Sequence, residues 1–324
     1  MGARLSRRDL LLLAGATALP AAGCTAKPAP WPPVPSGPAP AVTAGGGPAP
    51  FTPGRVMLGG YVDLRGMTAA ESLRLRRRQL GRDLRIVHRY YSWTDRLPAT
   101  LAYLPAGSTL MLSWRGPTLR EITGGGADRL ITAAARRLAA GRRPILLRWG
   151  WDMNRDFFRW GGAANGRSPE GYVTAWRRLR RLFREAGADN VAWVWSPNAD
   201  TQPDEDWNRI DGYYPGDEHV DWVGVSGYAR QETPAQMFDE VYQRYSARKP
   251  IMIAEVAVAD RGGASKPDWI TDFAAWVRLR PAVGAAVWFD TDTHPGSAEN
   301  WRIDSDPNSL AAYRALATEP VFGG

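Results

Sequence analysis

The chain of 324 residues contains one cysteine and three histidines. Cys24 alone cannot form a disulfide within the chain, which excludes the small disulfide-stapled modules. His88, His219 and His294 are scattered without the spacing of a metal site, so no metal and no cofactor are expected. No GxGxxG or GxxxxGK turn follows a predicted strand, which argues against a nucleotide-binding fold. With 44% hydrophobic and 23% charged residues, the composition is that of one large globular domain or two ordinary ones.

Lysine is also scarce: it occurs at positions 27, 249 and 266, so nearly all of the 41 basic residues are arginine. The formal net charge is +8. Many arginines fall on the polar faces of predicted helices, such as the face that carries Arg177 and Arg181, and we interpret them as a solvated surface. Nucleic acid is therefore not an expected partner. Tryptophan is abundant, with 15 Trp against 11 Tyr and 8 Phe, which indicates either a heavy core or surfaces that stack on ligands.

The first residues resemble an export signal. Arg4, Arg7 and Arg8 precede the apolar residues 10–14, a run too short to span a bilayer permanently. Residues 6–11 have the twin-arginine pattern, which is typical of proteins exported in the folded state. We therefore expect residues 1–23 to be a twin-arginine lipoprotein signal peptide.

Cys24 follows Ala21-Ala22-Gly23, as in a bacterial lipoprotein cleavage site. Lipidation of Cys24 would anchor the protein to the outer face of the cytoplasmic membrane, whereas a cleaved signal with a free thiol would release it from the cell. Residues 25–54 are mostly Pro, Ala and Gly with one charge, a composition that cannot bury a core. We predict a disordered linker over 24–54 and one folded domain over 55–320.

From residue 55 onward, short apolar runs alternate with amphipathic helical stretches. A capping box at Thr68 and Glu71 predicts a helix that ends at Gly81, and Ser168-Pro169 predicts the start of another. Eight strands with intervening helices over about 260 residues indicate a single (β/α)8 TIM barrel, an α/β fold, with a doubly wound sheet as the alternative. The predicted strands are residues 56–62, 85–91, 109–114, 144–149, 190–195, 221–225, 250–254 and 284–289.

In such a barrel the active site lies where the strands end. The fourth strand runs into Asp152 and the seventh ends at Glu255. Two carboxylates at the mouth of a barrel are what glycoside hydrolysis requires, one as proton donor and one as nucleophile or base. The alternatives are that Asp152 caps its loop and that Glu255 pairs with an arginine.

Tryptophans also occur at or just after the ends of the predicted strands. There their rings could stack on sugars or, alternatively, plug the top of the barrel. These residues are Trp114, Trp149, Trp151, Trp160, Trp195 and Trp288.

The order of these motifs resembles glycoside hydrolase family 26, best known for endo-β-1,4-mannanases, over nearly all of residues 56–318. The resemblance implies Asp152 as acid/base, Glu255 as nucleophile, Tyr228 as a hydrogen-bond donor to that nucleophile and Trp288 as a sugar platform. It also implies a polysaccharide substrate and no cofactor. Further substrate-binding candidates are Arg148, Trp151, Asn154, Phe157, Trp160, Trp114 and Trp195. The matching motifs are residues 144–154, 190–198, 214–228, 249–255, 288–290 and 301–302.

The sequence departs from the family pattern around the expected site. Trp151-Asp152 replaces the usual His-Glu, and Arg155, Phe157 and Ser226 replace Gly, Trp and Asp. Because Asp is one methylene shorter than Glu, the two carboxyl groups could lie further apart than the about 5–5.5 Å of retaining enzymes. We therefore expect a slower or geometrically altered enzyme.

The expected function is that of a secreted, monomeric hydrolase of β-linked polysaccharides, closest in kind to mannan endo-1,4-β-mannosidase. Two alternatives remain open at this stage. One is a lipoprotein that binds a polysaccharide without cutting it. The other is an enzyme that acts on a glycan of the producing cell's own envelope.

Overall fold

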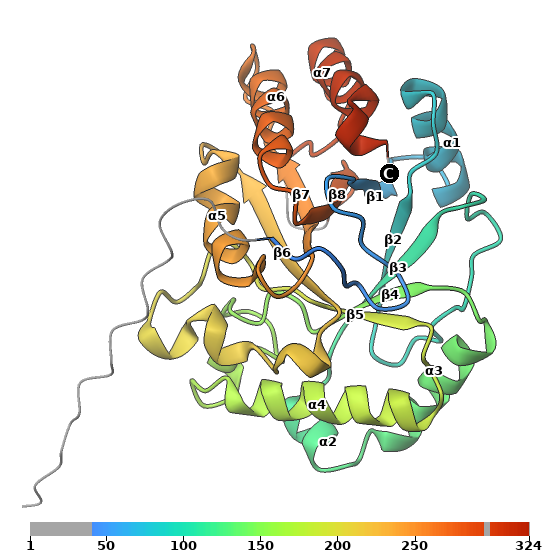
Figure 1. Ribbon diagram of the computed structural model, residues 1–324, viewed down its shortest axis with the longest axis vertical. Helices are drawn as coiled ribbons and strands as arrows, with labels where there is room; N and C mark the ends of the chain where they lie inside the picture. The colour runs from blue at the N-terminus through green and yellow to red at the C-terminus, as the bar shows by residue number, and fades with distance from the viewer. Residues whose placement is uncertain (1–40, 295–298, 324) are drawn as a thin grey trace, which may run out of the picture. The chain divides into compact units, whose positions relative to one another are not determined.

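The computed structural model describes residues 41–294 and 299–323, so the predicted signal peptide, Cys24 and the first part of the linker lie outside the described residues. Eight parallel strands form one closed barrel in sequence order, and β1 pairs with β8 to close it (Figure 1). The prediction of a (β/α)8 barrel is confirmed, and the doubly wound alternative is wrong. The strands are β1 (Met57–Asp63), β2 (Ile86–Tyr91), β3 (Thr109–Trp114), β4 (Ile145–Trp149), β5 (Val191–Trp195), β6 (Trp222–Ala229), β7 (Ile251–Val258) and β8 (Val283–Thr291).

Helices surround the barrel and cover the outer face of the sheet (Figure 1). The capping box at Thr68 and Glu71 is formed, and α1 ends at Gly81 as predicted. The short α2 and the last helix, α7, were not predicted. None of the helices in the described ranges has the length and hydropathy needed to cross a bilayer. They are α1 (Ala69–Leu80), α2 (Leu119–Thr123), α3 (Asp128–Ala140), α4 (Glu170–Glu185), α5 (Pro234–Tyr245), α6 (Ser265–Arg278) and α7 (Pro307–Thr318).

Alternate strand residues point into the barrel and out toward the helices, because successive side chains of a strand lie on opposite faces. One buried cluster, which includes Met111, Leu146 and Met252, fills the barrel interior. A larger cluster, which includes Leu112, Leu147 and the apolar faces of the helices, lies between sheet and helices. We call the end at which the strands finish the mouth and the opposite end the base.

The base is closed by residues 42–54, which cross this end of the barrel before β1 (Figure 1). Phe51 is only 7% exposed, and the Trp222 indole Nε1 donates to the carbonyl oxygens of Gly46 and Ala49 at 3.1 and 3.0 Å. At Gly46 the backbone φ is +88°, and a Cβ would lie 2.5 Å from the Ala49 carbonyl oxygen, so only glycine fits. The prediction of a disordered linker is therefore wrong for residues 42–54, which are packed against the barrel.

Candidate active site

Arg148, Asp152 and Glu255 meet inside the barrel near its mouth. Arg148 is an inward-pointing residue of β4 and is fully buried. Its Nη1 lies 2.5 Å from Glu255 Oε2, and its Nη2 lies 3.5 Å from Asp152 Oδ1. Glu255 and Asp152 are 3% and 5% exposed. The two predicted carboxylates are therefore brought together on one guanidinium. Glu255 does pair with an arginine, as the alternative expected, but that arginine belongs to the same site.

Glu255 reaches the interior because β7 is irregular. Ala254 belongs to the cluster inside the barrel, so strict alternation would turn the next side chain outward. The pairing of β6 with β7 shifts register between Val225 and Ser226, and that of β7 with β8 shifts between Ile253 and Val256. Such a bulge redirects a side chain, here toward Arg148.

Asp152 lies in the loop after β4 with a backbone φ of 54°, a left-handed conformation that Asp tolerates better than most residues. Its N–H donates to the Ser196 carbonyl oxygen at 2.9 Å, and its Oδ2 accepts from Asn198 Nδ2 at 2.9 Å. Burial raises the pKa of Asp152 to about 6, although the neighbouring Arg148 charge lowers it. A carboxyl group that titrates there can carry a proton to a leaving group.

Behind the carboxylates, polar side chains hold Arg148 in place. Its Nη2 donates to Ser226 Oγ, and its Nη1 lies 3.4 Å from Ser113 Oγ. Ser113 Oγ in turn is 2.6 Å from His88 Nε2. Burial, followed by the charges of Arg148 and Arg89, lowers the pKa of His88 well below its ordinary value, so this imidazole is neutral. His88 therefore orients Ser113 without adding a second charge beside Arg148.

One side of the mouth is an aromatic wall made of Tyr61, Tyr90, Tyr228, Phe289 and Trp301. The Tyr61 ring stacks on Phe289 with centroids 5.3 Å apart, and Tyr228 packs on Trp301 at 5.6 Å. The three tyrosines are partly exposed, and a partly exposed ring with a hydroxyl group suits a sugar. Apart from Tyr228, these residues are not among the site residues expected from the sequence. The alternation of inward and outward residues along β1, β2 and β8 was the sequence signal that could have identified most of them.

The hydrogen bond expected from Tyr228 to Glu255 is absent from the described residues. Tyr90 is the tyrosine that stands against this carboxylate. Burial, and then the negative charge of Glu255, raise the pKa of Tyr90 well above its ordinary value. Tyr228 instead contacts Phe289 and Trp301, further along the wall.

Four of the tryptophans expected at the mouth lie outside the barrel. Trp114 stacks on Trp93 at 4.2 Å, and Trp288 packs on Tyr313 of α7 at 5.1 Å. Each neighbours an inward residue on its strand, so its own side chain must face the helices. The prediction of a sugar platform is wrong for these residues, as is the alternative that they plug the mouth. They are Trp114, Trp149, Trp195 and Trp288, all 0–2% exposed.

The loop after β4 supplies a second aromatic group. The Trp151 ring lies 5.3 Å from the Arg148 guanidinium carbon and 5.3 Å from the Tyr90 ring, so it borders the cluster of Arg148, Asp152 and Glu255. Trp160 is buried and donates its indole N–H to the Trp151 carbonyl oxygen, so it supports Trp151 rather than facing a ligand. Phe157, at 65% exposure, is the most exposed aromatic residue of this loop, and its ring also contacts Phe158 and the Arg155 guanidinium.

Asn154 also has a structural role. It is fully buried, its Oδ1 accepts from the Asn198 N–H, and its Nδ2 donates to the Asn198 carbonyl oxygen. This double hydrogen bond joins the loops after β4 and β5, and Asn198 then holds Asp152. Asn154 therefore supports Asn198, the residue that holds Asp152, and its buried amide is not placed as the predicted substrate contact would be.

The exposed Phe157 and the buried Trp288 allow a testable comparison. Phe157→Ala is expected to raise KM several-fold while leaving the free energy of unfolding within about 0.5 kcal/mol, because its ring is exposed. Trp288→Phe should instead lower the free energy of unfolding by about 1–3 kcal/mol and leave KM nearly unchanged. Urea unfolding and steady-state kinetics on both variants check this. A KM effect confined to Trp288→Phe would contradict the placement.

Comparisons with known proteins identify the family to which the chain belongs. Residues 127–303 match the model of glycosyl hydrolase family 26. The chain is 36% identical over 255 residues to Endoglucanase H of Acetivibrio thermocellus, covering 72% of this chain and 27% of that protein. It is 30% identical over 141 residues to Beta-1,3-xylanase TXYA of a Vibrio species, covering 42% and 28%. The chain thus spans little more than a quarter of the length of these relatives.

Among solved structures, a modular endo-β-1,4-mannanase from Cellulomonas fimi superposes with a TM-score of 0.60 at 16% identity, covering 83% of this chain and 72% of that one. At that identity the likeness concerns the fold alone. The family match, however, includes β4, the loop with Asp152, and β7 with Glu255. The chain is a member of glycosyl hydrolase family 26.

Proposed function

We propose that this protein hydrolyses β-glycosidic bonds within a polysaccharide, with Asp152 as the general acid/base and Glu255 as the nucleophile. The observation that carries the proposal is the difference between the two carboxyl groups on Arg148. Glu255 is in close ion-pair contact with the guanidinium, whereas Asp152 is further away and has a raised pKa. Where two carboxyl groups of a site lie in different environments, the one with the raised pKa usually acts as the acid and the other as the nucleophile.

In the first step, protonated Asp152 gives its proton to the glycosidic oxygen while a Glu255 oxygen attacks the anomeric carbon and the bond to the leaving group breaks. Arg148 Nη1 donates to Glu255 Oε2 and so occupies one of its oxygens, which leaves the other to attack. In the second step, Asp152 takes a proton from water, and the water oxygen releases the sugar from Glu255.

We propose a β-linked glucan or mannan as the substrate. The relative that matches 72% of this chain is named an endoglucanase, and the superposed structure is a mannanase. Trp151 and Ser226 contact Arg148 from two sides. Both differ from the residues usual in the family, so the part of the site around the reacting sugar is where a preference away from mannan would arise.

Incubation with a panel of mannans, β-glucans and xylans, with new reducing ends as the readout, tests this function. The proposal predicts release from at least one β-glucan or mannan. Binding to a polysaccharide without release of reducing ends would instead support the alternative of a non-hydrolytic binding lipoprotein. Release from an α-glucan alone would contradict the proposal.

We also propose that the protein is exported and that Cys24 carries a lipid anchor. The support is the twin-arginine pattern at residues 6–11 and the Ala-Ala-Gly-Cys sequence at 21–24. Metabolic labelling with a fatty acid, compared between the natural chain and Cys24→Ser, would detect the lipid.

The pKa of Asp152 sets the pH profile. Because its pKa is raised to about 6 and the acid must be protonated for the first step, kcat/KM should fall as the pH rises above about 6, approaching tenfold per pH unit. Below pH 6 this group stays protonated and causes no loss. Asp152→Asn should remove the alkaline limb together with most of the activity. An alkaline limb above pH 8 in the natural enzyme would contradict this assignment.

A further inference from the structure

Arginine collects at the base of the barrel. The helices begin near the mouth and end near the base, and the last turns of α1, α3, α4 and α6 all carry arginine. Partial negative charge at helix C-termini favours such residues. It does not account for Arg85, Arg142 and Arg143, which lie in the connections that lead into β2 and β4. The base thus carries more positive charge than the helix C-termini account for.

Much of this charge is unpaired. Arg77, Arg248 and Arg278 have acidic partners, namely Asp83, Asp217 and Glu319. Six other basic residues of the base are exposed and form no ion pair within residues 41–294 and 299–323. These are Arg55, Arg78, Arg85, Arg142, Arg143 and Arg184.

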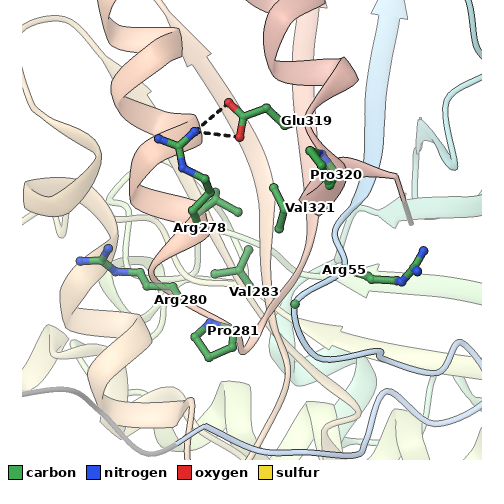
Figure 2. Close-up of a pocket in the computed structure, with 10 residues that line it drawn as sticks. Arg55, Arg278, Arg280, Pro281, Val283, Glu319, Pro320 and Val321 are labelled. Carbon is green, nitrogen blue, oxygen red and sulfur yellow. Dashed lines mark hydrogen bonds and ion pairs between the residues drawn. The ribbon is translucent and has the colours of Figure 1, made fainter.

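An apolar side chain stands among these charges. Leu279 follows the end of α6 and is 80% exposed, the largest exposed fraction among the large hydrophobic residues described. Arg278 and Arg280 flank it and also line a pocket of about 510 Å³ together with Arg55 and Pro281 (Figure 2). Arg278 is turned toward Glu319, with which it pairs, whereas Arg55 has no ion-pair partner among the residues that the structure describes (Figure 2). An exposed leucine beside arginines is the composition of surfaces that lie on lipid headgroups.

We propose that the positively charged base of the barrel, defined by the six unpaired arginines and Leu279, binds the surface of an anionic lipid bilayer. The charges would neutralise phosphate headgroups, and Leu279 would enter the boundary between headgroups and acyl chains. The chain itself reaches the barrel at this face, because the Val42 N–H donates to the Ser246 carbonyl oxygen just after α5. Binding through the base therefore turns the mouth, with Asp152 and Glu255, away from the bilayer and toward a polysaccharide. The proposal does not depend on the hydrolase activity.

Vesicle sedimentation tests it with the full chain carrying Cys24→Ser, so that no acyl group is attached. The probe is a vesicle of equal parts phosphatidylglycerol and phosphatidylcholine, compared with pure phosphatidylcholine. Two variants are matched in charge: Arg85→Gln/Arg142→Gln/Arg143→Gln at the base, and Arg129→Gln/Arg230→Gln/Arg261→Gln at exposed positions toward the mouth. Leu279→Ser tests the apolar contact.

Binding to the anionic vesicles is expected to weaken with salt and to exceed binding to phosphatidylcholine. The base variant should lose on the order of 100-fold in partitioning, the control variant should lose far less, and Leu279→Ser should lose several-fold. Equal losses in both triple variants, or binding indifferent to the vesicle charge, would overturn the proposal. Displacement from vesicles by stoichiometric duplex DNA would also overturn it, in favour of a nucleic-acid surface. Hydrolysis of a soluble glycan should be unchanged in the base variant, which separates this test from that of the proposed function.

Discussion

Glu255→Ala is expected to reduce kcat by more than about 10⁴-fold on any polysaccharide that the natural enzyme cleaves. The variant loses the atom that forms the covalent bond to the sugar, and no other carboxylate is available on that side of Arg148 within the described residues. Polysaccharide binding should persist, because the aromatic wall and Phe157 are untouched. Reducing-end assays and affinity electrophoresis measure the two properties.

A chemical rescue makes this result specific. Azide should enter the space vacated by the carboxylate and attack the anomeric carbon, giving a glycosyl azide and restoring part of the activity of Glu255→Ala. Asp152→Ala supplies the matched control, because azide that enters the acid's side would give a product of the opposite anomeric configuration. Full activity in Glu255→Ala without azide would contradict the assignment of the nucleophile.

Arg148→Met is expected to lower the free energy of unfolding by about 3–5 kcal/mol, because it leaves two buried carboxyl groups without the cation between them. The remaining activity should also shift with pH. Arg148 lowers the pKa of Asp152, so its loss should raise that pKa further and move the alkaline limb to higher pH. Denaturant unfolding and the pH dependence of kcat/KM measure the two effects.

Arg178→Met provides the control for this prediction. Arg178 pairs with Asp128 on the outer surface at 2.6 Å, and a partly exposed surface pair of this kind contributes only about 0–1 kcal/mol. Equal destabilisation by the two substitutions would show that Arg148 is not the centre of a buried charge cluster.

The positions of the strands could be predicted from the sequence because each is a short apolar run bounded by helix signals. Alternation along them also carried more information than the tryptophan count. Arg148 and Ser113 point inward, so their neighbours Trp149 and Trp114 had to face the helices. The tryptophan excess is therefore mainly a property of the layer between sheet and helices.

Two features of the structure, one at the mouth and one at the base, could not be predicted from alternation or composition. Glu255 follows the inward Ala254, and only the bulge in β7 turns both side chains into the barrel. Residues 42–54 have the composition of a linker, yet Gly46 and Phe51 close the base through tertiary contacts with Trp222. Both features depend on contacts with residues far away in the chain, which local sequence patterns do not reveal.

The anomeric configuration of the first-formed product tests the central claim most directly. The mechanism through Glu255 as nucleophile proceeds by two displacements, so proton NMR of a β-glycan digest should show the β-anomer first, followed by slow mutarotation. Appearance of the α-anomer first would mean that water attacks directly in a single displacement, and would contradict Glu255 as the nucleophile.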